Sequence, residues 1–293
     1  MRNKERRVVW VNALALLTGF VALVRAGTSD LDQARKYYDL TDFDQSLKIL
    51  HALPQRDGAV YELLGRNYFM TGDFKKATDA LEKAVMLEPR NSDYVLWLGR
   101  AYGRRAETSN PFSSMSHASK ARQYFERAAE LNPRNIEALN DLLEYYLEAP
   151  GFLGGGFEKA KATVVRISQV DSAEGHWAQS KLDEKHKEIG SAEEHLRRAL
   201  ELSPNRVGRF IDLARFLAKQ GRFQESEQNF ARAEQIDPQS PKLMYARADV
   251  YIKYGRNLEA AKSLLQRYLA AEITPEDPPK SDARKLLRQI EGS

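Results

Sequence analysis

Hydrophobic residues recur three and four positions apart along most of the chain after residue 27. They form segments of about 13 residues, and this spacing is typical of an amphipathic helix with one buried face. Short polar turns with glycine or proline separate the segments. The pattern therefore predicts an all-α chain built from paired helices.

The helix pairs share a repeated motif, Leu-Gly-x-x-Tyr, then Gly-x-Phe-x-x-Ala, then a hydrophobic residue, alanine and proline. Residues 58–91 match it nearly throughout, from Leu64 to Pro89, and residues 207–240 match it again. Residues 92–135 also match, but Pro133 lies 44 residues after Pro89, where a spacing of about 34 is expected. The small residues let two helices approach closely, and stacked pairs bury a continuous core that one pair cannot form alone.

The motif resembles that of the tetratricopeptide repeat family, with weaker copies extending the match over residues 27–291. The resemblance implies a right-handed superhelix, or α-solenoid, of about seven helical hairpins in one repeat domain, residues 27–293, closed by a C-terminal cap helix. The expected units are hairpins 27–57, 58–91, 92–135, 136–174, 175–206, 207–240 and 241–273, and a cap helix at 281–291.

The same resemblance implies a concave groove lined by the first helix of each hairpin. Three arginines among the implied groove positions are suited to bind partner carboxylates through forked hydrogen bonds. The alternative is a solvated helix face whose charges pair within the chain. The Lys and Asn clamp of chaperone-binding family members is not matched. The implied groove residues are Glu62, Arg66, Phe69, Asp93, Leu96, Arg100, Asn140, Glu144, Ile211, Arg215, Tyr245 and Asp249.

Two insertions interrupt the repeat, at residues 103–115 and 148–157. Both fall between the two helices of a hairpin, so we expect two loops on the same edge of the array, where repeat proteins often bind ligands. The second insertion contains three consecutive glycines, residues 154–156. They suggest an anion cradle of backbone N–H groups, or else a flexible turn. The residues of this candidate loop site are Phe112, Phe152, Gly154, Gly155 and Gly156.

The first 26 residues are typical of a targeting segment. A cationic stretch, residues 1–7, precedes a largely apolar run, residues 8–24, and a possible cleavage site follows before Gly27. The run fits either a cleaved signal peptide or an uncleaved membrane anchor. The positive residues before it favour export of the rest of the chain. The chain lacks cysteine and Asn-x-Ser/Thr sites, so we expect a bacterial envelope protein, periplasmic or anchored in the inner membrane.

The net charge is +4, but it arises in the targeting segment. Residues 27–293 hold 40 basic and 40 acidic residues. A body without positive excess argues against a nucleic-acid partner. The absence of cysteine excludes disulfides, thiolate metal sites and a cysteine nucleophile.

The sequence contains no recognisable catalytic motif or nucleotide-binding loop. Its five histidines are scattered, which predicts no metal site and no cofactor. We therefore expect a non-catalytic scaffold that binds a protein or peptide segment in the groove or at the inserted loops. The alternatives are an enzyme or small-ligand binder with a site built from loops 103–115 and 148–157, and an array that self-associates.

Overall fold

The computed structural model describes residues 30–291. The targeting segment at residues 1–26 lies outside this range, so its two interpretations are not tested. The described residues form α-helices, one short 3₁₀ helix and no strands. Within residues 30–291, every helix is too short or too polar to cross a bilayer.

The chain divides into two compact units, one ending at Pro89 and the other beginning at Arg90. The sequence predicted a single repeat domain over residues 27–293 and gave no sign of this division. Within each unit, consecutive helical hairpins stack on one another, as in an α-solenoid.

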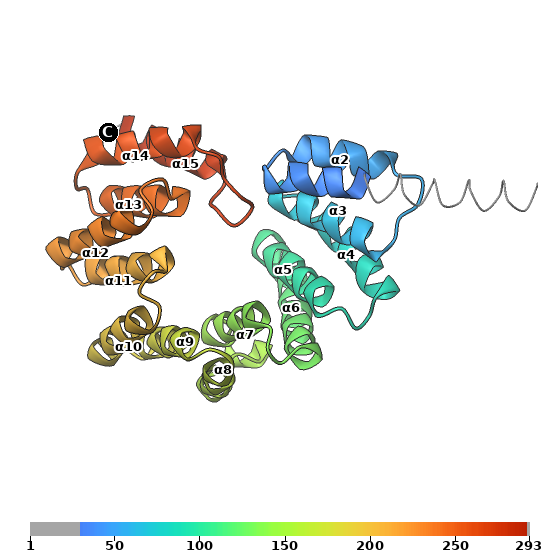
Figure 1. Cartoon of the computed structure of the whole chain (residues 1–293). Coiled ribbons are helices and arrows are strands. Elements are labelled where there is room, and N and C mark those ends of the chain that lie inside the picture. The colour runs from blue at the N-terminus through green and yellow to red at the C-terminus, as the bar shows by residue number, and fades with distance from the viewer. Residues whose placement is uncertain (1–29, 292–293) are drawn as a thin grey trace, which may run out of the picture. The chain divides into compact units, whose positions relative to one another are not determined.

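The first unit contains two helical hairpins (Figure 1). A helical segment at 30–39 pairs with α2 (Phe43–Ala52), and α3 (Gly58–Met70) pairs with α4 (Phe74–Leu87). Their core includes Tyr38 and Leu63, which are 1% and 0% exposed. The buried Asn67 donates hydrogen bonds from Nδ2 to Ser46 Oγ and the Leu63 carbonyl, which satisfies its two amide hydrogens.

The second unit contains five hairpins and a closing helix (Figure 1). Its first helices contact one another directly in the pairs α7 with α9 and α11 with α13. The hairpins are α5 (Ser92–Thr108) with α6 (Pro111–Leu131), α7 (Ile136–Glu148) with α8 (Phe157–Val170), α9 (Ser172–Lys185) with α10 (Ile189–Leu202), α11 (Val207–Lys219) with α12 (Phe223–Ile236), and α13 (Pro241–Lys253) with α14 (Leu258–Ala270), followed by α15 (Lys280–Glu291).

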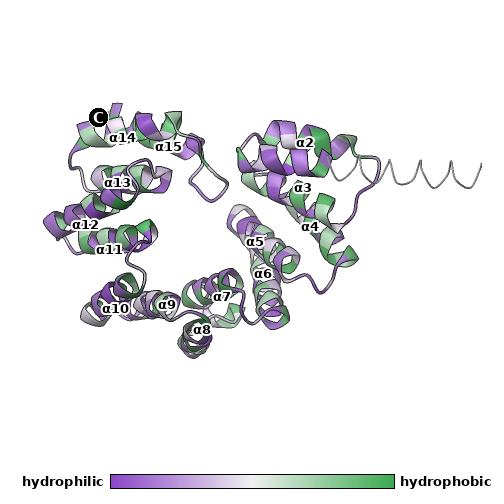
Figure 2. Ribbon diagram, in the orientation of Figure 1, coloured by the Kyte–Doolittle hydropathy of each residue, from purple (hydrophilic) through white to green (hydrophobic). Residues whose placement is uncertain are grey.

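Hydrophobic and hydrophilic residues occupy different sides of the helices (Figure 2). Polar caps fix where the helices begin: the side chains of Asp57, Asp73 and Asn135 accept hydrogen bonds from backbone N–H groups three residues on. Gly72 and Gly221 have φ angles of 83° and 76° in the turns between paired helices. Glycine adopts this left-handed conformation without the strain that other residues incur there.

The expected loop at 103–115 is wrong. Helix α5 continues to Thr108 and α6 begins at Pro111, so only two residues separate them. The extra residues lengthen both helices, to 17 and 21 residues. The Asn110 side chain caps α6 by accepting a hydrogen bond from the Ser113 N–H, and Pro111 occupies the first turn, where proline is favoured.

Two boundaries also differ from those that the repeat motif suggests. Helix α9 begins at Ser172, three residues before the hairpin expected at 175, because Asp171 caps it by accepting a hydrogen bond from the Glu174 N–H. Helix α15 begins at Lys280, and the Pro279 carbonyl accepts a hydrogen bond from the Asp282 N–H.

Candidate functional site

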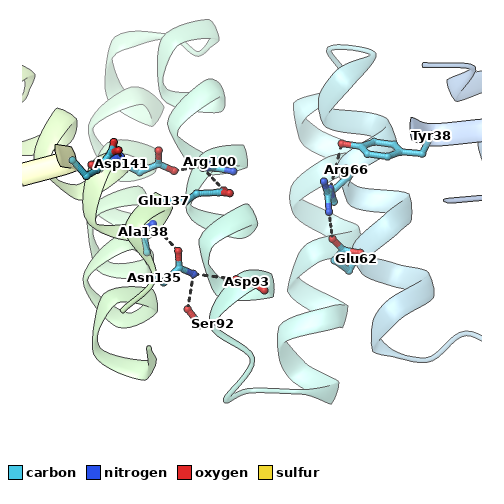
Figure 3. Close-up of polar contacts among 12 residues, drawn as sticks. Tyr38, Glu62, Arg66, Ser92, Asp93, Arg100, Asn135, Glu137, Ala138 and Asp141 are labelled. Carbon is cyan, nitrogen blue, oxygen red and sulfur yellow. Dashed lines mark hydrogen bonds and ion pairs between the residues drawn. The ribbon is translucent and has the colours of Figure 1, made fainter. Parts of the chain in front are cut away.

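The groove residues expected in the first unit are held by contacts within the chain. Glu62 is 4% exposed and accepts a hydrogen bond from Arg66 at 3.1 Å. Arg66 Nε also donates to the Tyr38 hydroxyl at 3.2 Å (Figure 3). Phe69 packs edge-on against Phe74, with ring centres 5.6 Å apart. These contacts hold Arg66 by intrachain interactions, which is the alternative that the sequence left open.

Arg100 on α5 is also held within the chain. It forms ion pairs with Asp141 at 2.5 Å and Glu137 at 3.0 Å, both on α7 (Figure 3). Asp93 accepts a hydrogen bond from Asn135 Nδ2 at 3.0 Å. The first helices of two successive hairpins are therefore joined by polar contacts. Desolvation around Asp141 raises the pKa of this carboxyl group, and the nearby Arg100 partly offsets the rise.

Two expected groove residues are core residues instead. Leu96 is 2% exposed and Ile211 is completely buried. Their positions on α5 and α11 face packed side chains rather than an open surface. The repeat positions implied by the family resemblance thus place Leu96 and Ile211 on first helices, as expected, but these residues lie on the buried face instead of the groove face.

The residues expected near the C-terminal end form looser contacts. Arg215 is exposed, and its guanidinium lies 4.0 Å from the Asp249 carboxylate. Tyr245 is partly buried, with its ring centre 5.4 Å from that of Tyr268. The exposed ion pair between Arg215 and Asp249, at 4.0 Å, adds little to stability.

A groove of about 680 Å³ lies on the first helices of three successive hairpins, α7, α9 and α11. Two of its lining residues, Asn140 and Glu144, were expected from the sequence. The others were not among the expected groove positions: four lie on α7, four on α9 and one on α11. The lining residues are Asn140, Asp141, Leu143, Glu144, Leu147, Glu148, Trp177, Lys181, Glu184, Lys185 and Lys219.

A buried ion pair lies between the three helices that form the groove. Glu174 on α9 and Arg209 on α11 are 8% and 7% exposed and pair with each other. Asn140 on α7 donates a hydrogen bond to the same carboxylate at 3.0 Å. The carboxylate thereby fixes side chains from α7 and α11, and the ring of Trp177 lies beside the Arg209 guanidinium.

Three polar atoms around this ion pair are buried without a hydrogen-bond partner among the described residues. They are Asn140 Oδ1, Trp177 Nε1 and Arg209 Nε. Asn140 and Trp177 also line the groove. Unsatisfied buried donors and acceptors are unfavourable, and because these three atoms are closed off from solvent they are not presented to a ligand in the groove.

Most of the charged groups in the groove are paired. Lys185 lies 2.9 Å from Glu148, and Lys219 lies 2.6 Å from Glu184. Glu144 is exposed, yet the surrounding helices remove part of its hydration. This desolvation, with the negative charges of Asp141 and Glu148, raises the pKa of the Glu144 carboxyl group.

Of the two alternatives for the glycine run at residues 154–156, the anion cradle is not supported, because the backbone N–H groups are already hydrogen-bonded within the chain. Gly154 donates to the Gly151 carbonyl, Gly155 to Pro150, and Gly156 to Tyr146. Residues 151–153 form a 3₁₀ helix, η1 (Gly151–Leu153).

The two phenylalanines of the candidate loop site remain exposed. Phe152 on η1 is 78% exposed, and Phe112 on α6 is 86% exposed. Of segments 103–115 and 148–157, only Glu148 lines the groove.

The histidines form one pair that the sequence did not indicate. His176 on α9 and His195 on α10 lie with their Nδ1 atoms 2.8 Å apart, although they are 19 residues apart in sequence. Burial, the neighbouring His195 and Arg198 lower the pKa of His176. Within residues 30–291, no group of three or more metal-ligating side chains is placed to hold an ion.

Comparison with known families matches the tetratricopeptide repeat at residues 58–91, 178–241 and 217–290. The chain belongs to the tetratricopeptide repeat family. This confirms the resemblance noted in the sequence and the all-α solenoid that it implied. Tetratricopeptide repeat proteins are generally non-catalytic scaffolds that bind other proteins.

Solved tetratricopeptide repeat structures share the fold. A protein from Parabacteroides merdae aligns with a TM-score of 0.58 and 13% identity, over 91% of this chain and 99% of its own. A thermophilic protein from Thermus thermophilus aligns with a TM-score of 0.54 and 19% identity, over 65% of this chain and 98% of its own. No curated protein matches the sequence.

Another similar structure is Acl4, the assembly chaperone of RpL4. It aligns with a TM-score of 0.50 and 16% identity, over 78% of this chain and 96% of its own. At these identities the likeness concerns the fold.

Proposed function

We propose that this tetratricopeptide repeat protein is a non-catalytic scaffold that binds a peptide segment of a partner protein in the groove of α7, α9 and α11. The observation that carries the proposal is the groove itself, about 680 Å³ in volume and lined by three first helices. Its lining includes the side chains of Leu147 and Trp177, which offer apolar contact surface to a peptide.

The structure does not favour the alternative of an enzyme or small-ligand site built from loops 103–115 and 148–157. Residues 103–115 belong mostly to α5 and α6, and the glycine N–H groups at 154–156 are bonded to backbone carbonyls. The exposed Phe112 and Phe152 offer apolar contact surface rather than titratable groups.

Selection of peptides by the whole chain from a displayed random library tests the proposal. Selected peptides are then measured by fluorescence anisotropy against Leu147→Arg, which places a bulky charge in the groove. The matched control is Leu202→Arg on α10, at a leucine that is 41% exposed. We expect the groove variant to lose binding and the control to retain it, with unchanged circular dichroism for both. Equal binding by the two variants, or no selected peptide, would reject the groove as the site.

We further propose that the repeat units act outside the cytoplasm, in a bacterial envelope. The support is the cationic stretch at residues 1–7 followed by the apolar run at residues 8–24. Fractionation of cells that express the native chain tests this proposal, and the mass of the purified protein shows whether the segment is removed. Recovery in the cytoplasmic fraction would refute it.

A further inference from the structure

The groove has walls of different charge, and this difference bears on the proposed function. Helix α7 contributes three carboxylates to the groove, while α9 and α11 contribute three lysines and one carboxylate. Helix α7 therefore forms an acidic wall, and the facing helices form a predominantly basic one. These residues are Asp141, Glu144 and Glu148 on α7, Lys181, Glu184 and Lys185 on α9, and Lys219 on α11.

Intrachain ion pairs neutralise most of these charges. Each of three pairs joins residues on two different first helices at 2.9 Å or less. The pairs are Arg100 with Asp141, Lys185 with Glu148, and Lys219 with Glu184. Among the described residues, Glu144 and Lys181 have no hydrogen-bond or ion-pair partner within the chain. Lys181 Nζ lies 5.4 Å from the Trp177 ring centre.

Glu144 and Lys181 are close enough to interact electrostatically but do not form an ion pair. The positive charge of Lys181 lowers the pKa of Glu144, whereas burial and two neighbouring carboxylates raise it. Lys181 acts in the same way on Asp212 of α11. The acidic wall thus has one carboxylate left to receive a cation, and the basic wall has one ammonium group left to receive an anion.

The distance between the two walls sets the spacing of a complementary ligand. Helices α7 and α9 are in contact, and the axes of packed helices lie about 8–10 Å apart. An extended peptide advances about 3.3 Å per residue. Charged side chains about two or three residues apart therefore match groups on neighbouring helices.

We infer that the partner segment is an extended peptide with a Lys or Arg that binds Glu144 and, about two or three residues away, an Asp or Glu that binds Lys181. The inference depends on the proposed function, because it defines the ligand of the same groove. Leu147 and Trp177 line the same groove, and their apolar side chains offer contact surface for the other residues of the peptide.

Peptides selected by the whole chain from a displayed random library are the probe. We expect them to be enriched in a basic and an acidic residue at this spacing. Synthetic peptides are then paired with protein variants in double-mutant cycles: Glu144→Gln against a peptide whose Lys is replaced by Gln, and Lys181→Gln against one whose acid is replaced by its amide. Each single change should weaken binding about fivefold. When the protein and peptide changes are combined, their effects on the binding free energy should not be additive.

Matched controls are Glu130→Gln on α6 and Lys161→Gln on α8, which are exposed and outside the groove. We expect neither to change the affinity. Selected peptides that bind, and lose binding with Leu147→Arg, yet show no coupling to Glu144 or Lys181 would overturn the inference and leave the proposed function intact. Failure to select any peptide would overturn both.

Discussion

Gly99 and Gly103 lie four residues apart on α5 and should respond in opposite directions to the same substitution. A Cβ atom at Gly99 would lie 2.8 Å from two ring carbons of Phe125 and 3.2 Å from Tyr124 Cβ. A Cβ atom at Gly103 would have no neighbour within 4 Å. The pair thus separates the intrinsic effect of alanine in a helix from the effect of close packing between α5 and α6.

The magnitudes follow from these distances. Alanine is favoured over glycine inside a helix by about 0.5–1 kcal/mol. Because nothing obstructs it, Gly103→Ala should raise the free energy of unfolding by that amount. Overpacking a well-filled core costs about 1–3 kcal/mol, so Gly99→Ala should lower the free energy of unfolding by about 1–2 kcal/mol after the helix gain is subtracted.

Urea and thermal unfolding followed by circular dichroism measure both variants. For a unit of this size, 1 kcal/mol corresponds to a shift of about 2–4 °C in Tm, so the two variants should move the midpoint in opposite directions. If Gly99→Ala is as stable as the native chain or more stable, the close approach of α5 and α6 does not limit packing at this position.

Two further predictions concern buried or titrating groups. Arg209→Met leaves the Glu174 carboxylate buried without its main partner, which should lower the free energy of unfolding in urea by about 3–5 kcal/mol; a loss below about 1 kcal/mol would contradict this. Burial and His195 lower the pKa of His176, so its contribution to stability is complete above its ordinary pKa of about 6.5 and is lost as the pH falls below it. His176→Asn should reduce the loss of stability between about pH 7 and about pH 5; an unchanged loss would contradict this.

The helical hairpins could be predicted because the motif encodes them locally. Leu64 and Gly65 in one copy, and the matching residues at 207–240, fall on helices that begin at residues 58 and 207. The spacing of buried residues and the proline that follows most of the pairs depend only on nearby sequence. Such signals remain valid whatever lies next to the hairpin.

The insertion at 103–115 was misinterpreted although the sequence held the relevant signal. Asn110 followed by Pro111 is the pattern of a helix start, with the asparagine as the cap and proline in the first turn. Gly103 suggested a turn, but it lies within α5 with an open space beside it. A single glycine inside a helix is unfavourable by only about 1 kcal/mol, which neighbouring packing readily offsets.

The groove could be predicted only in part, because its partners come from different repeats. The motif assigned Asn140 and Glu144 to a first helix, and both line the groove. It could not pair Arg100 with Asp141, 41 residues further on, or His176 with His195. The first contact depends on how one hairpin packs against the next, and the second on how the two helices of one hairpin pack together. The periodicity within a single helix encodes neither.

The position of the candidate site follows from where charge remains after the chain has paired its own groups. Arg66 and Arg100 have the forked donors that suit a partner carboxylate, but Glu62 and Asp141 already occupy them. Binding a partner there would require breaking an existing pair, which offsets most of the gain. Glu144 and Lys181 have no such pair to lose among the described residues, so a ligand of matching charge gains from both at once. Recognition is therefore favoured on α7 and α9, on the second unit's own helices.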